Sequence, residues 1–293
     1  IAVALSRVPL LDLDIIVRIA ARLHLKVQQP TMLAQGPLQL TCSIGFCHSL
    51  QLARPTGRAL LDAAQIAGDE ASRYRPGAIR GYSADLARAR ADRDALRAGF
   101  ADAVDRGEIR AWFQPQLSTD SGEVTGIEAL VRWHHPDRGI LLPAAFLPAI
   151  SGSELMELLG QTVLTQALAT LAELDRRGLR VPTVAVNFSA QELRDPQLPE
   201  RLGWTLDRFH LAPSRLTVEV LESVVAGDGD EIIASNIDRI AAMGCGVDLD
   251  DFGTGNASIT AIRRFAPNRL KIYRSFVREV DQNRDQRMLV TAI

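Results

Sequence analysis

Residues 247–255 carry an apolar strand pattern directly into two adjacent carboxylates, Asp250 and Asp251, and a glycine-rich turn. Neighbouring acids repel each other unless a cation lies between them, so this spacing is typical of a metal site. On its own, the segment is also consistent with a strand followed by a hydrophilic turn. The rest of the chain decides between the metal site and the hydrophilic turn.

Three upstream segments share the pattern of a short β-prone run that ends in an oxygen-bearing side chain. They are residues 126–133 with Glu128, residues 184–189 with Asn187, and residues 216–222 with Glu219. Hard oxygen donors of this kind favour Mg²⁺ or Mn²⁺ over Zn²⁺. The four runs therefore predict one shared metal site, and Asp251 predicts a second ion with Asp250 as the bridging ligand.

The elements that position these side chains alternate between the two kinds of secondary structure. Strands are predicted at residues 111–117, 126–133, 181–188, 216–222, 246–251 and 269–272, and helices at 144–150, 155–176, 200–209, 230–243 and 257–265. This alternation predicts an α/β fold of the (β/α) barrel type, with the active site at the carboxyl ends of the strands. The acids singled out above all fall at such ends.

Six motifs, in order, resemble the EAL-type cyclic-di-GMP phosphodiesterases, which are named for the Glu-Ala-Leu that occurs here at 128–130. The resemblance runs from about Trp112 to the last residue. Its motifs are Gln114-Pro115-Gln116, Glu128-Ala129-Leu130-Val131-Arg132-Trp133, Asn187-Phe188-Ser189, Glu219 with Glu222, Asp250-Asp251-Phe252-Gly253-Thr254-Gly255, and Leu270-Lys271-Ile272. Each motif is weak alone, but six in the family's order identify the chain as a member.

The resemblance implies a TIM-like barrel in which two divalent ions bind a phosphate of cyclic-di-GMP and activate the water that opens the ring to linear pGpG. It implies homodimer contacts through this domain. The residues that it implies are the metal ligands Glu128, Asn187, Glu219, Asp250 and Asp251, the catalytic residues Lys271, Asp251 and Glu222, and the substrate-binding residues Gln114, Leu130 and Arg132. Lys271 would help to hold the water, and Glu222 is expected to order the following turn. His135, before Pro136, is expected to be a structural hydrogen-bonding residue.

Residues 1–83 predict a strand at 1–5, a helix at 13–27, a half-buried strand at 38–46 and a helix at 59–73. On residues 41–46 and 63–82 this part resembles the C-terminal half of an α+β GGDEF-type diguanylate cyclase domain. The catalytic turn of that family would precede Ile1, so no cyclase activity is expected. Residues 84–106 predict a connecting helix, and residues 107–293 form the EAL-like domain.

The composition of the chain limits which binding partners and which cellular compartment we expect. The chain has 33 basic and 35 acidic residues, for a net charge of -2, which gives no bulk attraction to a nucleic-acid polymer. Its three cysteines, Cys42, Cys47 and Cys245, follow no disulfide or zinc pattern and suit a reducing compartment. Since no apolar stretch reaches the roughly 18 residues that a membrane span needs, we expect a cytoplasmic location, with any membrane tether lying upstream.

Two departures from the family bear on activity. Tyr273 replaces the acid of the family's Lys-Ile-Asp triplet, and the sequence ends at Ile293, before the family's Glu-Gly-Val-Glu and Gln-Gly segments. We therefore expect an incomplete barrel, an internal fragment of a longer tandem protein, with little or no activity by itself. A non-catalytic cyclic-di-GMP receptor is the alternative function, and a scaffolding pair of domains is a third.

Overall fold

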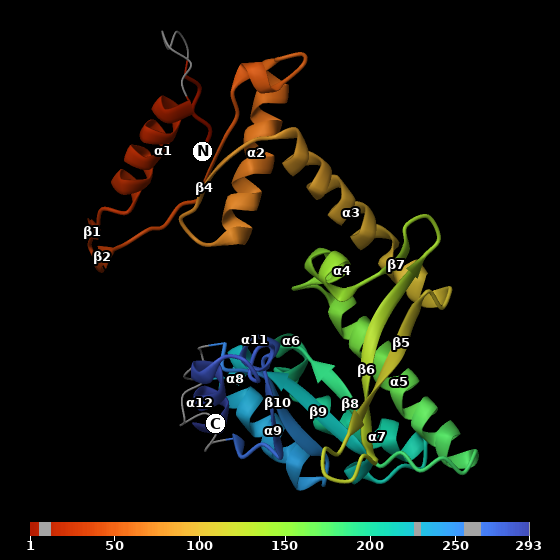
Figure 1. Cartoon of the computed structure of the whole chain (residues 1–293). Helices are drawn as coiled ribbons and strands as arrows, with labels where there is room; N and C mark the ends of the chain where they lie inside the picture. The colour runs from red at the N-terminus through yellow and green to blue at the C-terminus, as the bar shows by residue number, and fades with distance from the viewer. Residues whose placement is uncertain (6–12, 226–229, 255–264, 293) are drawn as a thin grey trace. The chain divides into compact units, whose positions relative to one another are not determined.

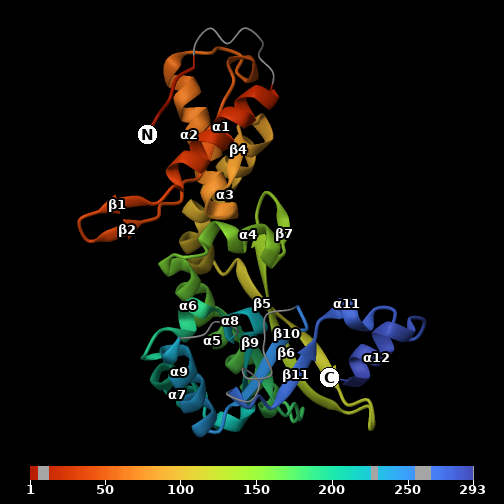
Figure 2. The same cartoon turned by 90° about the vertical axis from the view of Figure 1, so that its left-hand side faces the viewer.

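The computed structural model describes residues 1–5, 13–225, 230–254 and 265–292. The chain divides into two compact units, Ile1–Leu96 and Arg97–Ile293 (Figures 1 and 2). The division falls within one helix, α3 (Ala84–Asp105). Within the described parts of the chain, no helix is both long enough and apolar enough to cross a membrane.

The first unit consists of helices and two small two-stranded sheets. Its elements before α3 are α1 (Leu13–Val27), β1 (Thr31–Leu33), β2 (Gly36–Leu38), β3 (Ile44–Phe46), the 3₁₀ turn η1 (Ser49–Gln51), α2 (Gly57–Tyr74) and β4 (Ile79–Gly81). Strands β1 and β2 form an antiparallel hairpin, and β3 pairs with β4 in parallel. The predicted helices at 13–27 and 59–73 are confirmed by α1 and α2.

Two strand predictions in this unit are wrong. Residues 1–5 are exposed and form no strand, because a β-prone run needs a neighbouring strand to bond with and none of the described strands pairs with it. The single strand predicted at 38–46 is interrupted, since β2 ends at Leu38 and β3 begins at Ile44. The alternating pattern there spans two strands that belong to different sheets.

Helix α2 and strand β3 both have small residues where they contact each other. Its buried positions are Ala63, Ala67 and Ala71, which recur every four residues and so share one face. A Cβ added at Gly45 of β3 would lie 2.0 Å from the backbone nitrogen of Gly68. Only glycine permits this approach of strand to helix.

The second unit is a sheet with helices. Besides the end of α3, its elements are β5 (Ile109–Leu117), β6 (Val124–His135), β7 (Gly139–Leu141), α4 (Pro143–Ile150), α5 (Glu154–Arg176), β8 (Val184–Phe188), α6 (Ala190–Leu193), α7 (Leu198–Arg208), the 3₁₀ turn η2 (Pro213–Arg215), β9 (Leu216–Leu221), α8 (Glu222–Val225), α9 (Glu231–Ala242), β10 (Gly246–Phe252), β11 (Arg269–Ile272), α11 (Arg274–Val277) and α12 (Arg284–Ala292). The helix predicted at 257–265 lies outside the described residues except for Phe265.

The sheet runs in the order β11-β10-β9-β8-β6-β5, and β7 pairs with β6 outside this path. Strands β6, β8, β9, β10 and β11 are parallel, as the predicted α/β fold requires. Strand β5 is antiparallel to β6, and β7 is an additional short strand. Neither the direction of β5 nor the existence of β7 was predicted. For β5 the reason is that alternating apolar residues indicate a strand but not its direction. Helices α5, α7 and α9 lie along one side of the sheet (Figure 1).

An aromatic cluster between β6 and two helices, α3 and α4, determines which face of β6 is turned toward those helices. Trp133 of β6 is 2% exposed and makes an edge-on contact with Phe100 of α3, with ring centroids 5.5 Å apart. Phe146 of α4 completes the cluster, and the Trp133 indole nitrogen donates to Glu108 at 3.0 Å. Because side chains alternate along a strand, burial of Trp133 directs Glu128 to the opposite face.

Candidate metal centre

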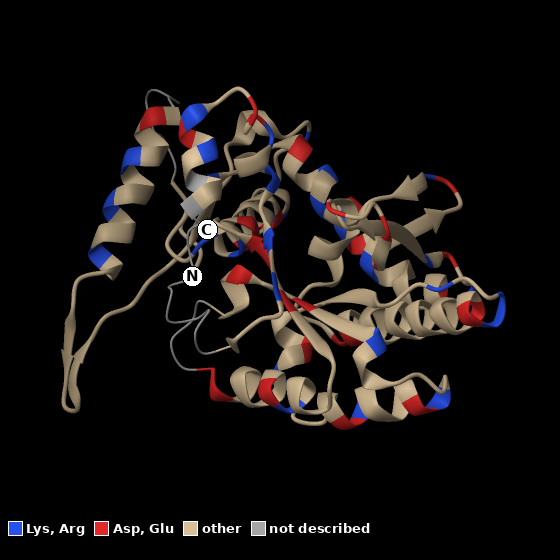
Figure 3. Cartoon of the chain, turned by 60° about the horizontal axis from the view of Figure 1, so that its bottom comes forward, with Lys and Arg blue, Asp and Glu red and all other residues tan. Residues whose placement is uncertain are grey.

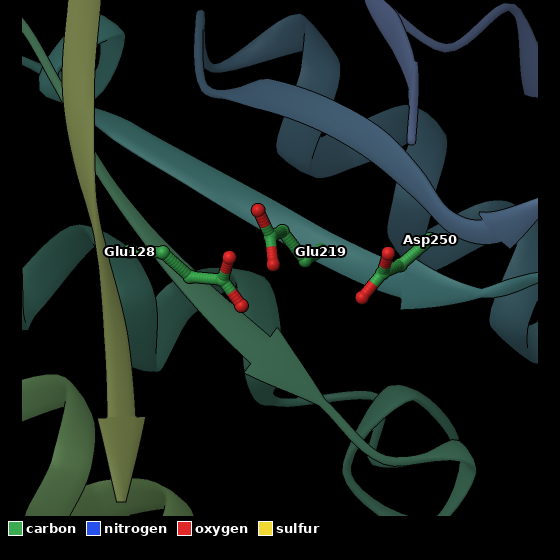
Figure 4. A group of neighbouring side chains, drawn as sticks. All are labelled: Glu128, Glu219 and Asp250. Carbon is green, nitrogen blue, oxygen red and sulfur yellow. The ribbon is translucent and has the colours of Figure 1, made fainter. Parts of the chain in front are cut away.

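Three carboxyl groups from three strands converge on the sheet face opposite the aromatic cluster. Glu128 is on β6, Glu219 on β9 and Asp250 on β10, and one oxygen of each lies within 4.8 Å of the others. Figure 4 shows the three groups turned toward a common space. The predicted convergence of Glu128, Glu219 and Asp250 is confirmed.

The ammonium group of Lys271 on β11 lies among these carboxylates. Its Nζ is 2.9 Å from Glu128 Oε2, 2.7 Å from Glu219 Oε2 and 3.5 Å from Asp250 Oδ2. Burial opposes the charged form of Lys271, but the hydrogen bonds and charges of the two glutamates outweigh it, so the pKa of Lys271 is raised. Lys271 therefore stays protonated at neutral pH and donates hydrogen bonds.

The two glutamates respond in opposite directions to this environment. Burial, followed by repulsion from Glu128, raises the pKa of Glu219 to about 8. Burial also acts to raise the pKa of Glu128, but hydrogen bonding to Lys271, the charge of Lys271 and a hydrogen bond from Asn187 lower it overall. Around neutral pH the cluster therefore carries a proton at Glu219.

The chemistry of the donors fits a divalent cation. Glu219 is 1% exposed, and its Oε1 is a buried oxygen that has no hydrogen-bond partner within the described part of the chain. Such an atom is costly unless something satisfies it. Asn187 stands beside Glu219 in the β8–β9 register and donates from Nδ2 to Glu128 Oε1 at 3.1 Å. Three carboxylates and one amide match the preference of Mg²⁺ and Mn²⁺ for oxygen ligands.

Asp251 lies outside the group of three carboxylates. Its φ of 54° is in the left-handed region, and the β10–β11 register shifts between Leu249 and Phe252. A bulge of this kind re-aims the side chains around it. Its backbone nitrogen donates to Asp250 Oδ1 at 2.8 Å, and burial together with the charge of Asp250 raises the pKa of Asp251.

Glu222 holds the turn that follows β10. Its Oε2 accepts hydrogen bonds from the backbone nitrogens of Gly253 at 2.7 Å and Thr254 at 2.9 Å, and from the Thr254 hydroxyl at 3.2 Å. Glu222 is 2% exposed. These contacts fix the turn just beyond Asp250.

The three predicted substrate-binding residues lie on the face that carries Glu128. Gln114 is exposed and stands opposite Glu128 in the β5–β6 register, while Leu130 and Arg132 follow Glu128 at alternate positions of β6. Arg132 donates from Nη1 to the Val131 carbonyl at 2.8 Å. His135 Nδ1 accepts from the backbone nitrogen of Asp137 at 3.2 Å, which confirms its structural role.

An ion pair between a buried carboxylate and an exposed arginine, next to the cluster, was missed from the sequence. Asp248 is 1% exposed, and its Oδ2 accepts from Arg269 Nε at 2.9 Å and lies 2.8 Å from Nη2. Arg269 also donates from Nη1 to Gln116 Oε1 of β5 at 3.2 Å. The pair thus links β10 and β11 to the opposite end of the sheet. The signal was available, since Asp248 and Arg269 each precede a site residue by two positions and so share its face.

The protonation of Glu219 predicts a pH-dependent metal affinity. Below about pH 8 an ion must displace the proton of Glu219, so the affinity for Mn²⁺ should rise by about tenfold per pH unit toward pH 8 and level off above it. Loss of the free Mn²⁺ signal in electron paramagnetic resonance titrations measures this affinity. An affinity that does not change between about pH 6 and pH 8 would contradict the prediction.

Comparison with known proteins places this geometry in a family. The chain is 31% identical over 266 residues to the oxygen sensor protein DosP of Escherichia coli K12, an alignment that covers 91% of this chain and 33% of DosP. It is 33% identical over 178 residues to the cyclic di-GMP phosphodiesterase RocR of Pseudomonas aeruginosa PAO1, covering 60% of this chain and 45% of RocR. The chain therefore spans less than half the length of either relative.

Solved structures share the fold of the second unit. The PaMucR phosphodiesterase in its c-di-GMP complex superposes with a TM-score of 0.63 and 32% identity, covering 68% of this chain and 80% of the PaMucR chain. The sequence profile of the EAL domain matches residues 97–293, which are more than half of the chain. The chain therefore belongs to the EAL domain family.

Proposed function

We propose that this protein hydrolyses cyclic-di-GMP to linear pGpG in a divalent-metal-dependent reaction. The observation that carries the proposal is the convergence of Glu128, Glu219 and Asp250 around Lys271 at one edge of an EAL-type sheet. The relatives RocR and MucR are named as cyclic-di-GMP phosphodiesterases, and the related PaMucR structure is a complex with that dinucleotide.

Two ions, Mg²⁺ or Mn²⁺, are proposed for the site. Glu128, Asn187, Glu219 and Asp250 would hold the first, and Asp250 with Asp251 the second. Bound ions would neutralise phosphate charge and lower the pKa of a bound water to near neutrality. The orphaned Oε1 of Glu219 supports this ligand set.

The protein's own side chains would orient the reactants. Lys271, held protonated, donates a hydrogen bond to the attacking water but cannot take its proton, which passes to a carboxylate of the cluster or to solvent. The water oxygen bonds to phosphorus, the P–O3′ bond breaks, and O3′ leaves with a proton. Arg132 would hold a phosphate oxygen, and Gln114 and Leu130 would line the dinucleotide.

The test is product analysis with the purified whole protein that contains this chain. Incubation of cyclic-di-GMP with Mg²⁺ or Mn²⁺ should give pGpG as the chromatographic product, and chelation by EDTA should stop its formation. If the protein neither hydrolyses nor binds cyclic-di-GMP under these conditions, the proposal is overturned.

A non-catalytic cyclic-di-GMP receptor is the second candidate, and Tyr273 is the observation that favours it. Tyr273 precedes α11 and donates its backbone N–H to the Phe252 carbonyl at 3.1 Å, two positions after Lys271. In the resembled family an acid stands there. Dinucleotide binding that survives EDTA, without hydrolysis, would support the receptor.

The remaining features belong to the same proposal. We propose a GGDEF-like half-domain at 1–83, a connecting helix at 84–106 and the EAL domain at 107–293, acting in the cytoplasm. A homodimer through the EAL domain is proposed from the resemblance of the chain to that family. The charges of both signs along the helices support a ligand that is held locally and not by bulk charge (Figure 3).

A further inference from the structure

An exposed tryptophan stands on the same face of the sheet as the metal centre. Trp112 of β5 is 47% exposed and pairs with Leu130 of β6, next to the pair formed by Gln114 and Glu128. Opposite residues of an antiparallel pair share a face, and alternate residues of a strand lie about 7 Å apart. The indole therefore projects from the Glu128 face, one side-chain position from the metal centre.

The indole of Trp112 has a hydrogen-bond partner and a cationic partner. Its Nε1–H donates to His134 Nε2 at 3.2 Å, and the two ring centroids lie 6.1 Å apart. The guanidinium carbon of Arg132 lies 5.7 Å from the indole centroid, within the range of a cation–π contact. A ring held in this way keeps its orientation while almost half of its surface faces solvent.

The other two tryptophans, Trp133 and Trp204, differ from Trp112 in exposure and in location. Trp133 is 2% exposed and belongs to the core, whereas Trp204 is 72% exposed and lies on helix α7, outside the sheet. A single exposed aromatic such as Trp204 needs no explanation. Trp112 differs because it is both ordered by hydrogen bonding and placed beside the carboxylate cluster.

We infer that Trp112, with Arg132 against its ring, is the stacking platform for one purine base of the dinucleotide, an inference that rests on the proposed function. A base is joined through one sugar to the phosphate that the metal centre would hold, so it must lie within one nucleotide of Glu128. Aromatic side chains stack on the π-face of any base. Trp112 therefore contributes affinity for the base, while the chemistry stays with the carboxylates and Lys271.

The test separates base binding from chemistry by using two substrates. Trp112→Ala should raise the KM for cyclic-di-GMP by about 5- to 100-fold, the loss expected for one stacked base, and leave kcat within about twofold. Trp112→Phe, which keeps a ring, should recover part of the affinity. Methyl p-nitrophenyl phosphate, a diester without a purine, should be hydrolysed equally by all variants. Trp204→Ala is the matched control and should behave as the wild type.

The outcomes distinguish this inference from the proposed function. If the wild-type protein neither binds nor hydrolyses cyclic-di-GMP, the proposed function fails. If it hydrolyses cyclic-di-GMP and Trp112→Ala keeps the wild-type KM, only the platform is overturned. An equal loss on both substrates would show that Trp112 supports the site's structure, and would likewise overturn the platform.

Discussion

Glu219→Gln is expected to lower the rate of cyclic-di-GMP hydrolysis by on the order of a thousandfold. The change keeps the size of the side chain and removes the carboxylate that would bind an ion. Glu219 is the most buried of the three carboxylates, and its Oε1 has no hydrogen-bond partner among the residues that the structure describes. Charge stabilisation by a bound ion contributes several kcal/mol to such reactions, and each 1.36 kcal/mol is about tenfold in rate.

Glu192→Gln is the matched control for this substitution. Glu192 is also a buried glutamate, 7% exposed, but it caps α6 by accepting hydrogen bonds from Ser189 at its Oε2. Burial raises the pKa of Glu192, and glutamine keeps a side-chain oxygen that can accept these hydrogen bonds. Glu192→Gln should therefore keep the wild-type kcat and Mn²⁺ affinity. If Glu219→Gln also kept both values, Glu219 would be excluded as a metal ligand.

The convergence of the three carboxylates was predictable because it follows from topology. Neighbouring strands present the side chains of paired positions on one face of the sheet, so acids on several strands can meet there. Burial of apolar residues on one face of β6 then fixed the face of Glu128, and the strand register carries that face to Glu219 and Asp250. Local pattern and global fold agree at these positions.

Features that depend on direction or on local backbone geometry could not be predicted. The antiparallel direction of β5 leaves the same alternating pattern in the sequence as a parallel strand would. The bulge at Asp251 sets its side chain apart from that of Asp250, and only the left-handed φ reveals it. Asp248 and Arg269 each share a face with a site residue, but they lie 21 residues apart in the sequence, and it is the pairing of β10 with β11 that brings them together.

Lys271→Met is expected to have two separable effects. Loss of a positioned donor should lower kcat by about 100- to 1000-fold. Without metal the variant should also lose about 2 kcal/mol of unfolding free energy, because Glu128, Glu219 and Asp250 would lose the cation that balances them. This figure is below the usual cost of breaking a buried pair because the Lys271 side chain is 27% exposed.

The ammonium group and a metal ion compete for the same carboxylates, and this competition makes the prediction testable. Added Mg²⁺ should raise the stability of Lys271→Met in urea titrations by more than it raises that of the wild type, since the ion replaces the missing charge. It should not restore kcat. The other lysine, Lys26, is exposed and bonds to Gln29, so Lys26→Met should change neither stability nor rate. Equal stabilisation of wild type and Lys271→Met by Mg²⁺ would mean that Lys271 and the ion do not share a site.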